Sequence, residues 1–109
     1  MVEIENRWNW GYNIHIICDG CGICCVEFLD DTDWGYVDGL MVHKSRQRQG
    51  IATRMMERSE EIVKEEGYSE IRLDVEKGRN FQFDWYKRLG YEVYDEDDKM
   101  YYMKKKLYV

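Results

Sequence analysis

The chain has 109 residues, of which 44% are hydrophobic and 35% charged, a balance that fits a single domain over residues 1–109 and excludes a second core. Sixteen basic and 22 acidic side chains give a formal net charge of −6, so the chain as a whole repels nucleic acid and anionic lipid. No apolar run reaches the ~18 to 20 residues of a membrane span, and residues 1–20 carry no basic-then-apolar leader. We therefore expect a cytoplasmic protein that binds neither nucleic acid nor membrane.

The first 43 residues predict four short strands, because apolar and polar residues alternate between turn-forming residues. In chain order these strands span residues 2–8, 12–18, 21–29 and 34–43. Asp19 and Gly20 suit a tight two-residue turn between the second strand and the third. Gly39, inside the fourth strand, suits a β-bulge or a close backbone approach.

The hydrophobic period changes from two residues to 3.6 over residues 50–66, which predicts an amphipathic helix. Its apolar stripe consists of Ile51, Ala52, Met55, Met56, Ser59, Ile62 and Val63. Gly67 suits the position just after the end of this helix. Residues 69–76 then alternate apolar and charged side chains, which predicts a strand.

A second helix is predicted to run to Leu89, with Asn80 as its N-cap and Gly90 as its stop. Residues 91–94 and 99–107 predict a closing hairpin around the acidic turn 95–98. The resulting order, ββββαβαββ, predicts an α+β or mixed α/β fold with two helices against a mostly antiparallel sheet.

The segment before the long helix has the features of an anion site. Gly50 lies at the helix N-terminus, where several backbone N–H groups lack an intrahelical acceptor and the helix dipole adds positive charge. Arg46, Arg48 and Arg54 surround this end in an otherwise acidic chain. The arrangement favours a pyrophosphate ligand. The alternative interpretation is a plain turn with solvated charges.

Two motifs flank the predicted strand at residues 69–76. The first is Gln47-x-x-Gly50-x-Ala52, between a strand and a long helix, and the second is WYKRLGYE at residues 85–92. They resemble the acyl-CoA motif Q/R-x-x-G-x-G/A and the later YEKLGF signature of the GCN5-related N-acetyltransferase (GNAT) family, and the resemblance covers residues 34–107. It implies the acyl-CoA N-acyltransferase fold and transfer of an acetyl group from acetyl-CoA, as co-substrate, to a primary amine of a peptide, a protein or a small molecule.

The resemblance also implies roles for individual residues. Main-chain amides of residues 48–53 would bind the CoA pyrophosphate, and the backbone of residues 40–42 would pair with the pantetheine arm like an added strand. Tyr86 would be the general acid that protonates the departing CoA thiolate, whereas its alternative role is packing on the helix face. The implied cofactor-binding residues are Leu40, Met41, Val42, Gln47, Arg48, Gln49, Gly50, Ile51, Ala52, Thr53 and Asn80.

The acceptor ammonium must lose a proton before it attacks, which requires a base or a water relay. Asp38 and Glu27 are the candidates, and strand alternation predicts that Asp38 shares one face with Tyr36 and Leu40. For each carboxylate the alternative is a solvated strand residue without a catalytic role. His43 is a further proton acceptor, with a plain surface position as its alternative.

The chain departs from the family pattern at two places. Arg79 occupies the position, seven residues before the tyrosine, where many members have an asparagine that contacts the cofactor, and Asn80 follows one residue later. Only residues 9–11 separate the first two predicted strands, where the family inserts one or two helices that wall the acceptor groove. An open groove, or a wall borrowed from a second subunit in a homodimer, is therefore expected. An open acidic groove favours a peptide or protein amine.

Four cysteines lie close together as C-x2-C-x2-C-C, at Cys18, Cys21, Cys24 and Cys25. We expect no metal site, because adjacent strand residues point to opposite faces and no distant C-x-x-C completes a ligand set. Cys18 and Cys21 are predicted to oppose each other across the turn, within reach of a disulfide under oxidation.

Two other functions remain open: a non-catalytic acyl-CoA-binding or protein-interaction domain of the same fold, and a small zinc-dependent module.

Overall fold

A computed structural model of the chain describes residues 4–10, 13–18, 21–28 and 32–107. These residues form one mixed sheet with two α-helices, which confirms the predicted order ββββαβαββ and the mixed α/β class. The elements are β1 (Ile4–Trp10), β2 (Asn13–Cys18), β3 (Gly22–Glu27), β4 (Gly35–Val42), the 3-10 turn η1 (Lys44–Arg46), α1 (Ile51–Glu65), β5 (Glu70–Glu76), α2 (Asn80–Arg88), β6 (Glu92–Glu96) and β7 (Met100–Lys106).

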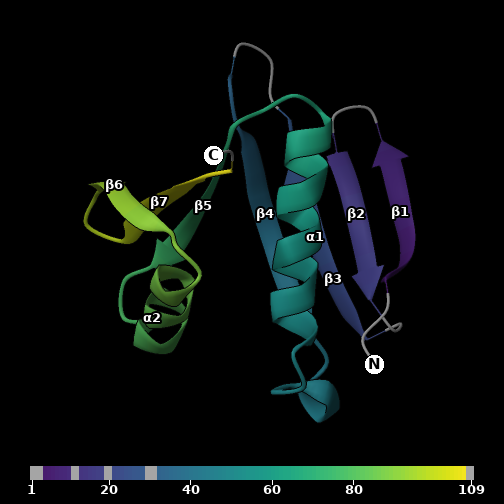
Figure 1. Cartoon of the computed structure of the whole chain (residues 1–109). Coiled ribbons are helices and arrows are strands. Elements are labelled where there is room, and N and C mark those ends of the chain that lie inside the picture. Colours follow the sequence, from purple (N-terminus) through teal and green to yellow (C-terminus); the bar gives the residue numbers. More distant parts are fainter. Residues whose placement is uncertain (1–3, 11–12, 19–20, 29–31, 108–109) are drawn as a thin grey trace.

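The sheet has the strand order β1-β2-β3-β4-β5-β7-β6, and β4 with β5 is its parallel pair. Helix α1 connects these two strands and lies across β2, β3 and β4, whereas α2 lies beside the β5–β7 end of the sheet (Figure 1). The two helices therefore flank the line along which β4 and β5 meet.

The core lies between α1 and the sheet. The buried stripe of α1 is the predicted one apart from Ala52, which is only half-buried. Alternate residues of β5, Ile71, Leu73 and Val75, are buried against it. Gly67 follows the C-cap residue of α1 with φ +93°, a left-handed conformation that favours glycine, as predicted.

Two local predictions are wrong. Cys18 pairs with Gly22, not with Cys21, so residues 19–21 connect β2 to β3 and the Asp19–Gly20 turn lies outside the described residues. Asn80 is the first residue of α2 and not its N-cap, because the carbonyl of Arg79 already accepts the first helical hydrogen bond, from Phe83 N at 3.0 Å. No side chain caps α2 at this end.

A β-bulge lies in β4 where Gly39 predicted one. Cys25 of β3 pairs with Gly39 while Val26 pairs with Val37, so Asp38 is the extra residue. The bulge shifts the side-chain alternation: Val37 faces the core before it, and Leu40 packs against the core after it. The prediction that Leu40 shares a face with Asp38 is therefore wrong.

Candidate functional site

Strands β4 and β5 pair over three residues and then separate. Their register runs from Gly35 opposite Ile71 to Val37 opposite Leu73, and the following part of β4 pairs only with β3. The last residues of β4 thus present one backbone edge that no described strand occupies. This edge is what an extended ligand needs in order to pair as an added strand.

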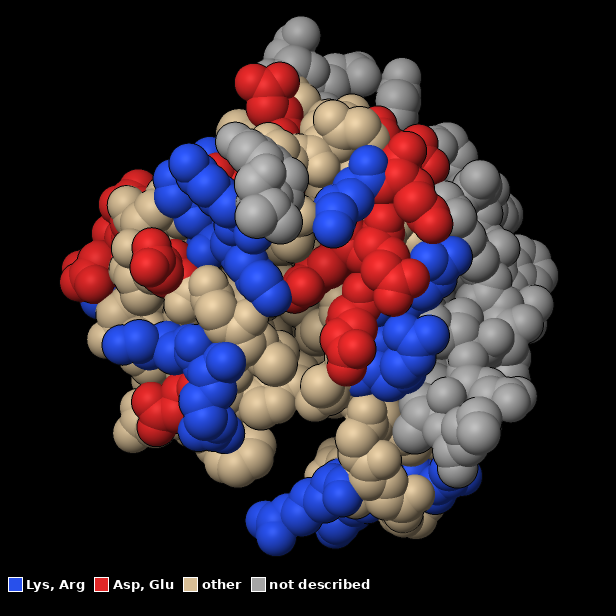
Figure 2. All heavy atoms as spheres, viewed as in Figure 1, with Lys and Arg blue, Asp and Glu red and all other residues tan. Residues whose placement is uncertain are grey.

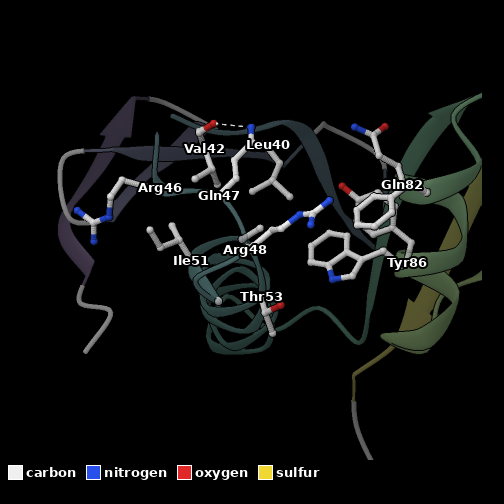
Figure 3. A pocket seen from close by; sticks show the side chains of 13 residues that line it. Leu40, Val42, Arg46, Gln47, Arg48, Ile51, Thr53, Gln82 and Tyr86 are labelled. Carbon is white, nitrogen blue, oxygen red and sulfur yellow. Dashed lines mark hydrogen bonds between the residues drawn. The ribbon is translucent and has the colours of Figure 1, made fainter. Parts of the chain in front are cut away.

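A cleft of about 460 Å³ opens on this edge (Figure 3). The end of β4, the loop before α1, the first turn of α1 and one face of α2 form its walls. The cleft is lined by Leu40, Val42, Arg46, Gln47, Arg48, Gly50, Ile51, Ala52, Thr53, Phe81, Gln82, Trp85 and Tyr86. Figure 2 shows basic side chains around the notch below α1, although acidic side chains cover the front of the helix itself.

The N-terminus of α1 faces the cleft without a side-chain cap. Gly50 is the N-cap residue, with φ +81°, and its carbonyl accepts the first helical hydrogen bond, from Arg54 N at 3.0 Å. The amides of residues 51–53 therefore have no acceptor within the helix. Together with the guanidinium groups of Arg46 and Arg48, these amides can hold a diphosphate.

Side-chain hydrogen bonds fix the loop that precedes α1. Gln47 Nε2 donates to the carbonyl of Val42 at 3.2 Å, and Arg46 Nε donates to Gln49 Oε1 at 2.9 Å. Arg48 has φ +64°, a left-handed conformation that costs a non-glycine residue about 1–2 kcal/mol. The two hydrogen bonds therefore offset part of this cost and hold the loop against the end of β4.

Tyr86 reaches the cleft from α2, and its hydroxyl points into the cleft in Figure 3. The side chain is only 9% exposed and packs against the rings of Trp85 and Tyr91. Burial, reinforced by the nearby Cys24 thiol, raises the pKa of Tyr86 to about 12. At neutral pH this hydroxyl is therefore a protonated hydrogen-bond donor.

The candidate bases Asp38 and Glu27 do not line the cleft. They lie with Tyr36 on the sheet face away from α1, beside the bulge, and the Tyr36 hydroxyl donates to Asp74 Oδ2 at 2.6 Å. Burial, and then the negative charge of Asp38, raise the pKa of Glu27. Burial, and then the hydrogen bond to Asp74, raise the pKa of Tyr36. This carboxylate group thus lies on the opposite face of the sheet, where β4 leaves β5.

Other predicted site residues lie apart from the cleft lining. Met41 is 71% exposed and lines a second, shallower hollow with Ile23, so only its backbone belongs to the free edge of β4. Gln49 and Asn80 are exposed, and neither lines the cleft. The ring of His43 accepts a hydrogen bond from Ser45 N at 3.1 Å and so caps η1.

Sequence reasoning missed the wall that α2 contributes. Gln82 lies three and four residues before Trp85 and Tyr86, a spacing that places all three on one helix face. Phe81 also lines the cleft and is 73% exposed, which is unusual for a phenylalanine. Because Tyr86 was already a candidate, helical spacing could have identified Gln82 and Trp85 as its neighbours on the same face.

The described cysteines do not form a cluster. Cys24 is fully buried with Sγ 3.3 Å from Ser59 Oγ, whereas Cys25 lies on the opposite face near Asp38 and Glu27. Within the described residues, no group of three or more His, Cys, Asp or Glu side chains is placed to hold a metal ion. Neither of the two described α-helices has the length and apolar character needed to cross a membrane.

Comparison with known proteins agrees with this geometry. The sequence pattern of the family described as "Acetyltransferase (GNAT) family" matches residues 5–91. N-alpha-acetyltransferase 30 of Schizosaccharomyces pombe is 35% identical over 57 residues, which are 52% of this chain and 38% of that protein. The chain thus spans less than half the length of this curated relative.

Solved structures with low sequence identity share the fold. A GNAT family acetyltransferase from Elizabethkingia anophelis, with acetyl-CoA bound, superimposes with a TM-score of 0.84 at 11% identity, covering 97% of this chain and 98% of that one. The PaiA N-acetyltransferase from Thermoplasma acidophilum, in complex with coenzyme A, superimposes with a TM-score of 0.75 at 22% identity. That superposition covers 86% of this chain and 59% of the other.

Proposed function

The chain belongs to the GNAT acetyltransferase family, and from this premise we propose that it is an N-acetyltransferase that transfers an acetyl group from acetyl-CoA to a primary amine. The observation that carries the proposal is the cleft between β4 and β5, where an uncapped helix N-terminus, a free strand edge and a buried tyrosine meet. A long anionic thioester requires an anion site for its phosphates, a strand edge for its amide groups and a proton donor for its sulfur. We propose a single acetyltransferase domain over residues 1–109.

The proposed cofactor site uses the backbone more than side chains. The uncapped amides of residues 51–53, with Arg46 and Arg48 beside them, suit the two phosphates. The free edge at Leu40, Met41 and Val42 suits the amide groups of the pantetheine arm. Gln47 contributes by holding the loop to Val42, and Gln49 by accepting the hydrogen bond from Arg46.

The proposed reaction is direct attack of a neutral amine on the thioester that acetyl-CoA supplies. The C–N bond forms, the C–S bond breaks, and the departing sulfur takes the electron pair and then a proton. Tyr86 is the proposed proton donor, because its protonated hydroxyl points into the cleft. A phenol of pKa about 12 is a weaker acid than an ordinary thiol of pKa near 8.5, so Tyr86 first stabilises the thiolate by a hydrogen bond. Burial raises the pKa of the CoA thiol as well, which reduces the difference between that pKa and the pKa of Tyr86 and so favours proton transfer.

The proposed acceptor reaches the thioester from the face away from α1, through the opening beside the bulge. Asp38 is the proposed base, and Glu27 supports it because its raised pKa makes it a stronger proton acceptor. β1 ends at Trp10 and β2 begins at Asn13, so no helix separates them. This open side favours a peptide or protein amine over a small metabolite.

Three further features of the proposal concern setting and partners. A cytoplasmic location is supported by the free thiols of Cys24 and Cys25, which are typical of a reducing compartment. The net charge of −6 favours cationic amines over nucleic acid or anionic membranes as partners. A homodimer would supply the second wall of the acceptor groove.

The second candidate is an acyl-CoA-binding domain without catalysis, favoured by the short β1–β2 connection. One experiment separates the two: the protein is incubated with acetyl-CoA and mixed peptides and amines, and thiol release and acetylated products are measured by a thiol reagent and mass spectrometry. Amine-dependent thiol release supports the enzyme. CoA binding in calorimetry without such release supports the binding domain, and no CoA binding contradicts both.

A further inference from the structure

Glu60 of α1 holds two groups that belong to the far end of the sheet. Its Oε2 accepts a hydrogen bond from the Tyr91 hydroxyl at 2.9 Å, and its Oε1 accepts one from Lys105 Nζ at 3.0 Å. Tyr91 lies just before β6, and Lys105 is in β7. The side chain of Glu60 is only 17% exposed, so both interactions are partly shielded from water.

This contact ties α1 to the half of the molecule that carries α2. The sheet itself joins the two halves through only three residue pairs between β4 and β5, from Gly35–Ile71 to Val37–Leu73. The first turn of α1 and the face of α2 line the same cleft. The distance between these two helices therefore depends in part on the side chains that link α1 to Tyr91 and Lys105.

Tyr91, which binds Glu60, also contacts Tyr86. Its ring is 1% exposed and meets the Tyr86 ring edge-on, with centroids 5.7 Å apart. Its backbone N–H donates to the carbonyl of Tyr86 at 3.0 Å. Gly90 between them has φ +103°, and a Cβ there would lie 3.3 Å from Lys105 Cε, so Lys105 also packs tightly against this turn.

We infer that Glu60 is a positioning residue that acts through Tyr91 to hold the Tyr86 hydroxyl at its place in the cleft. The inference rests on the proposed function, in which Tyr86 donates to the departing sulfur. The anion-binding loop is carried by α1 and the donor by α2, so a link between the two fixes the donor relative to the bound substrate. A misplacement of about 1 Å can reduce catalysis by about 10²-fold.

The test compares Glu60→Gln and Tyr91→Phe with Glu61→Gln as the matched control. Glu61 is the next residue of α1 and pairs instead with Arg58 at 3.0 Å, on the exposed side of the helix. We expect both test variants to lower kcat about 5- to 30-fold while the Kd for CoA stays within twofold, and Glu61→Gln to match the parent. In a Tyr86→Phe background, Glu60→Gln should lower kcat no further. An equal loss in both backgrounds would overturn the inference.

A second measurement does not depend on activity. Protein labelled with ¹³C in its tyrosine rings gives a Tyr86 NMR signal that the Tyr86→Phe variant identifies. Glu60→Gln should shift or broaden this signal and Glu61→Gln should leave it in place. An unmoved Tyr86 signal in folded Glu60→Gln contradicts the inference, whether or not the protein acetylates an amine. A moved signal in a protein without turnover contradicts only the proposed function. If Glu60→Gln does not fold, Tyr91→Phe carries both tests because it keeps the packed ring.

Discussion

Gly50 and Tyr86 line the same cleft, although Gly50 precedes the first turn of α1 and Tyr86 lies near the end of α2. Gly50 allows main-chain donors to face the cleft, and Tyr86 places one hydroxyl in it. The proposed binding role and the proposed catalytic role thus belong to different elements. Substitutions at the two positions should therefore have separable effects.

Gly50→Glu should weaken CoA binding by at least about 100-fold, measured by titration calorimetry. The new carboxylate would lie at the anion site, and an L-residue is strained at φ +81°. Gly67→Glu is the matched control, because Gly67 also has a positive φ and open space around it but lies at the other end of α1. Equal CoA affinity in the two variants would show that the loop does not hold the ligand.

Tyr86→Phe should lower kcat about 10²-fold while the Kd for CoA changes less than twofold, since only the proposed proton donor is removed. Stopped-flow or steady-state thiol release measures the first quantity and calorimetry the second. Tyr68→Phe is the control: Tyr68 stacks on Phe28 with centroids 5.2 Å apart, beyond the other end of α1. A parental kcat in Tyr86→Phe would mean that water supplies the proton.

The fold was largely predictable because its elements carry strong local patterns. The 3.6-residue stripe of α1 is followed by the glycine at position 67, and the alternation of Ile71, Leu73 and Val75 identifies β5. Both elements therefore agree with their predicted ranges within a residue or two. The order of these elements along the chain followed directly. Periodicity is a local property, and local properties can be read from one sequence.

The parts that failed depend on partners distant in the sequence. The bulge at Asp38 places Leu40 on the core face of the sheet, opposite to the face of Asp38. Only the register with β3 defines where this bulge lies. The contribution of Phe81 to the cleft depends on how α2 lies against α1. No local pattern distinguishes Glu60 from the other glutamates of α1, because Tyr91 and Lys105 are 31 and 45 residues away in the sequence.

Gly35→Ala should destabilise the fold by about 1–3 kcal/mol, because a Cβ there would lie 2.5 Å from Val63 Cγ2 and neither the strand nor α1 can move freely. The free energy of unfolding in urea measures the effect. Gly39→Ala, in the same strand, is the control, since a Cβ at Gly39 has no neighbour within 4 Å. A loss of equal size in both variants would contradict the packing argument.

Alkaline pH should destabilise the protein, and Cys24 should account for most of the loss that begins near pH 9. Burial also raises the pKa of Cys25, but by less. Burial raises the pKa of the Cys24 thiol from 9.0 to about 11, although the hydrogen bond with Ser59 acts in the opposite direction. Between these values the unfolded chain has lost the thiol proton while the folded chain still holds it. The free energy of unfolding therefore falls as pH rises above 9, by up to about 1.4 kcal/mol per pH unit, and is unaffected by this group below pH 9.

Urea unfolding at closely spaced pH values from neutral to about 11 measures this slope. Cys24→Ala should flatten the decline that begins near pH 9. Val26→Ala, a buried truncation in the same strand, should lower stability at every pH but keep the parental slope. Tyr36, Tyr86 and Tyr91 add their own decline above pH 10 in all three proteins, because burial raises the pKa of each. A parental slope in Cys24→Ala between pH 9 and 10 would show that the buried thiol is not the titrating group.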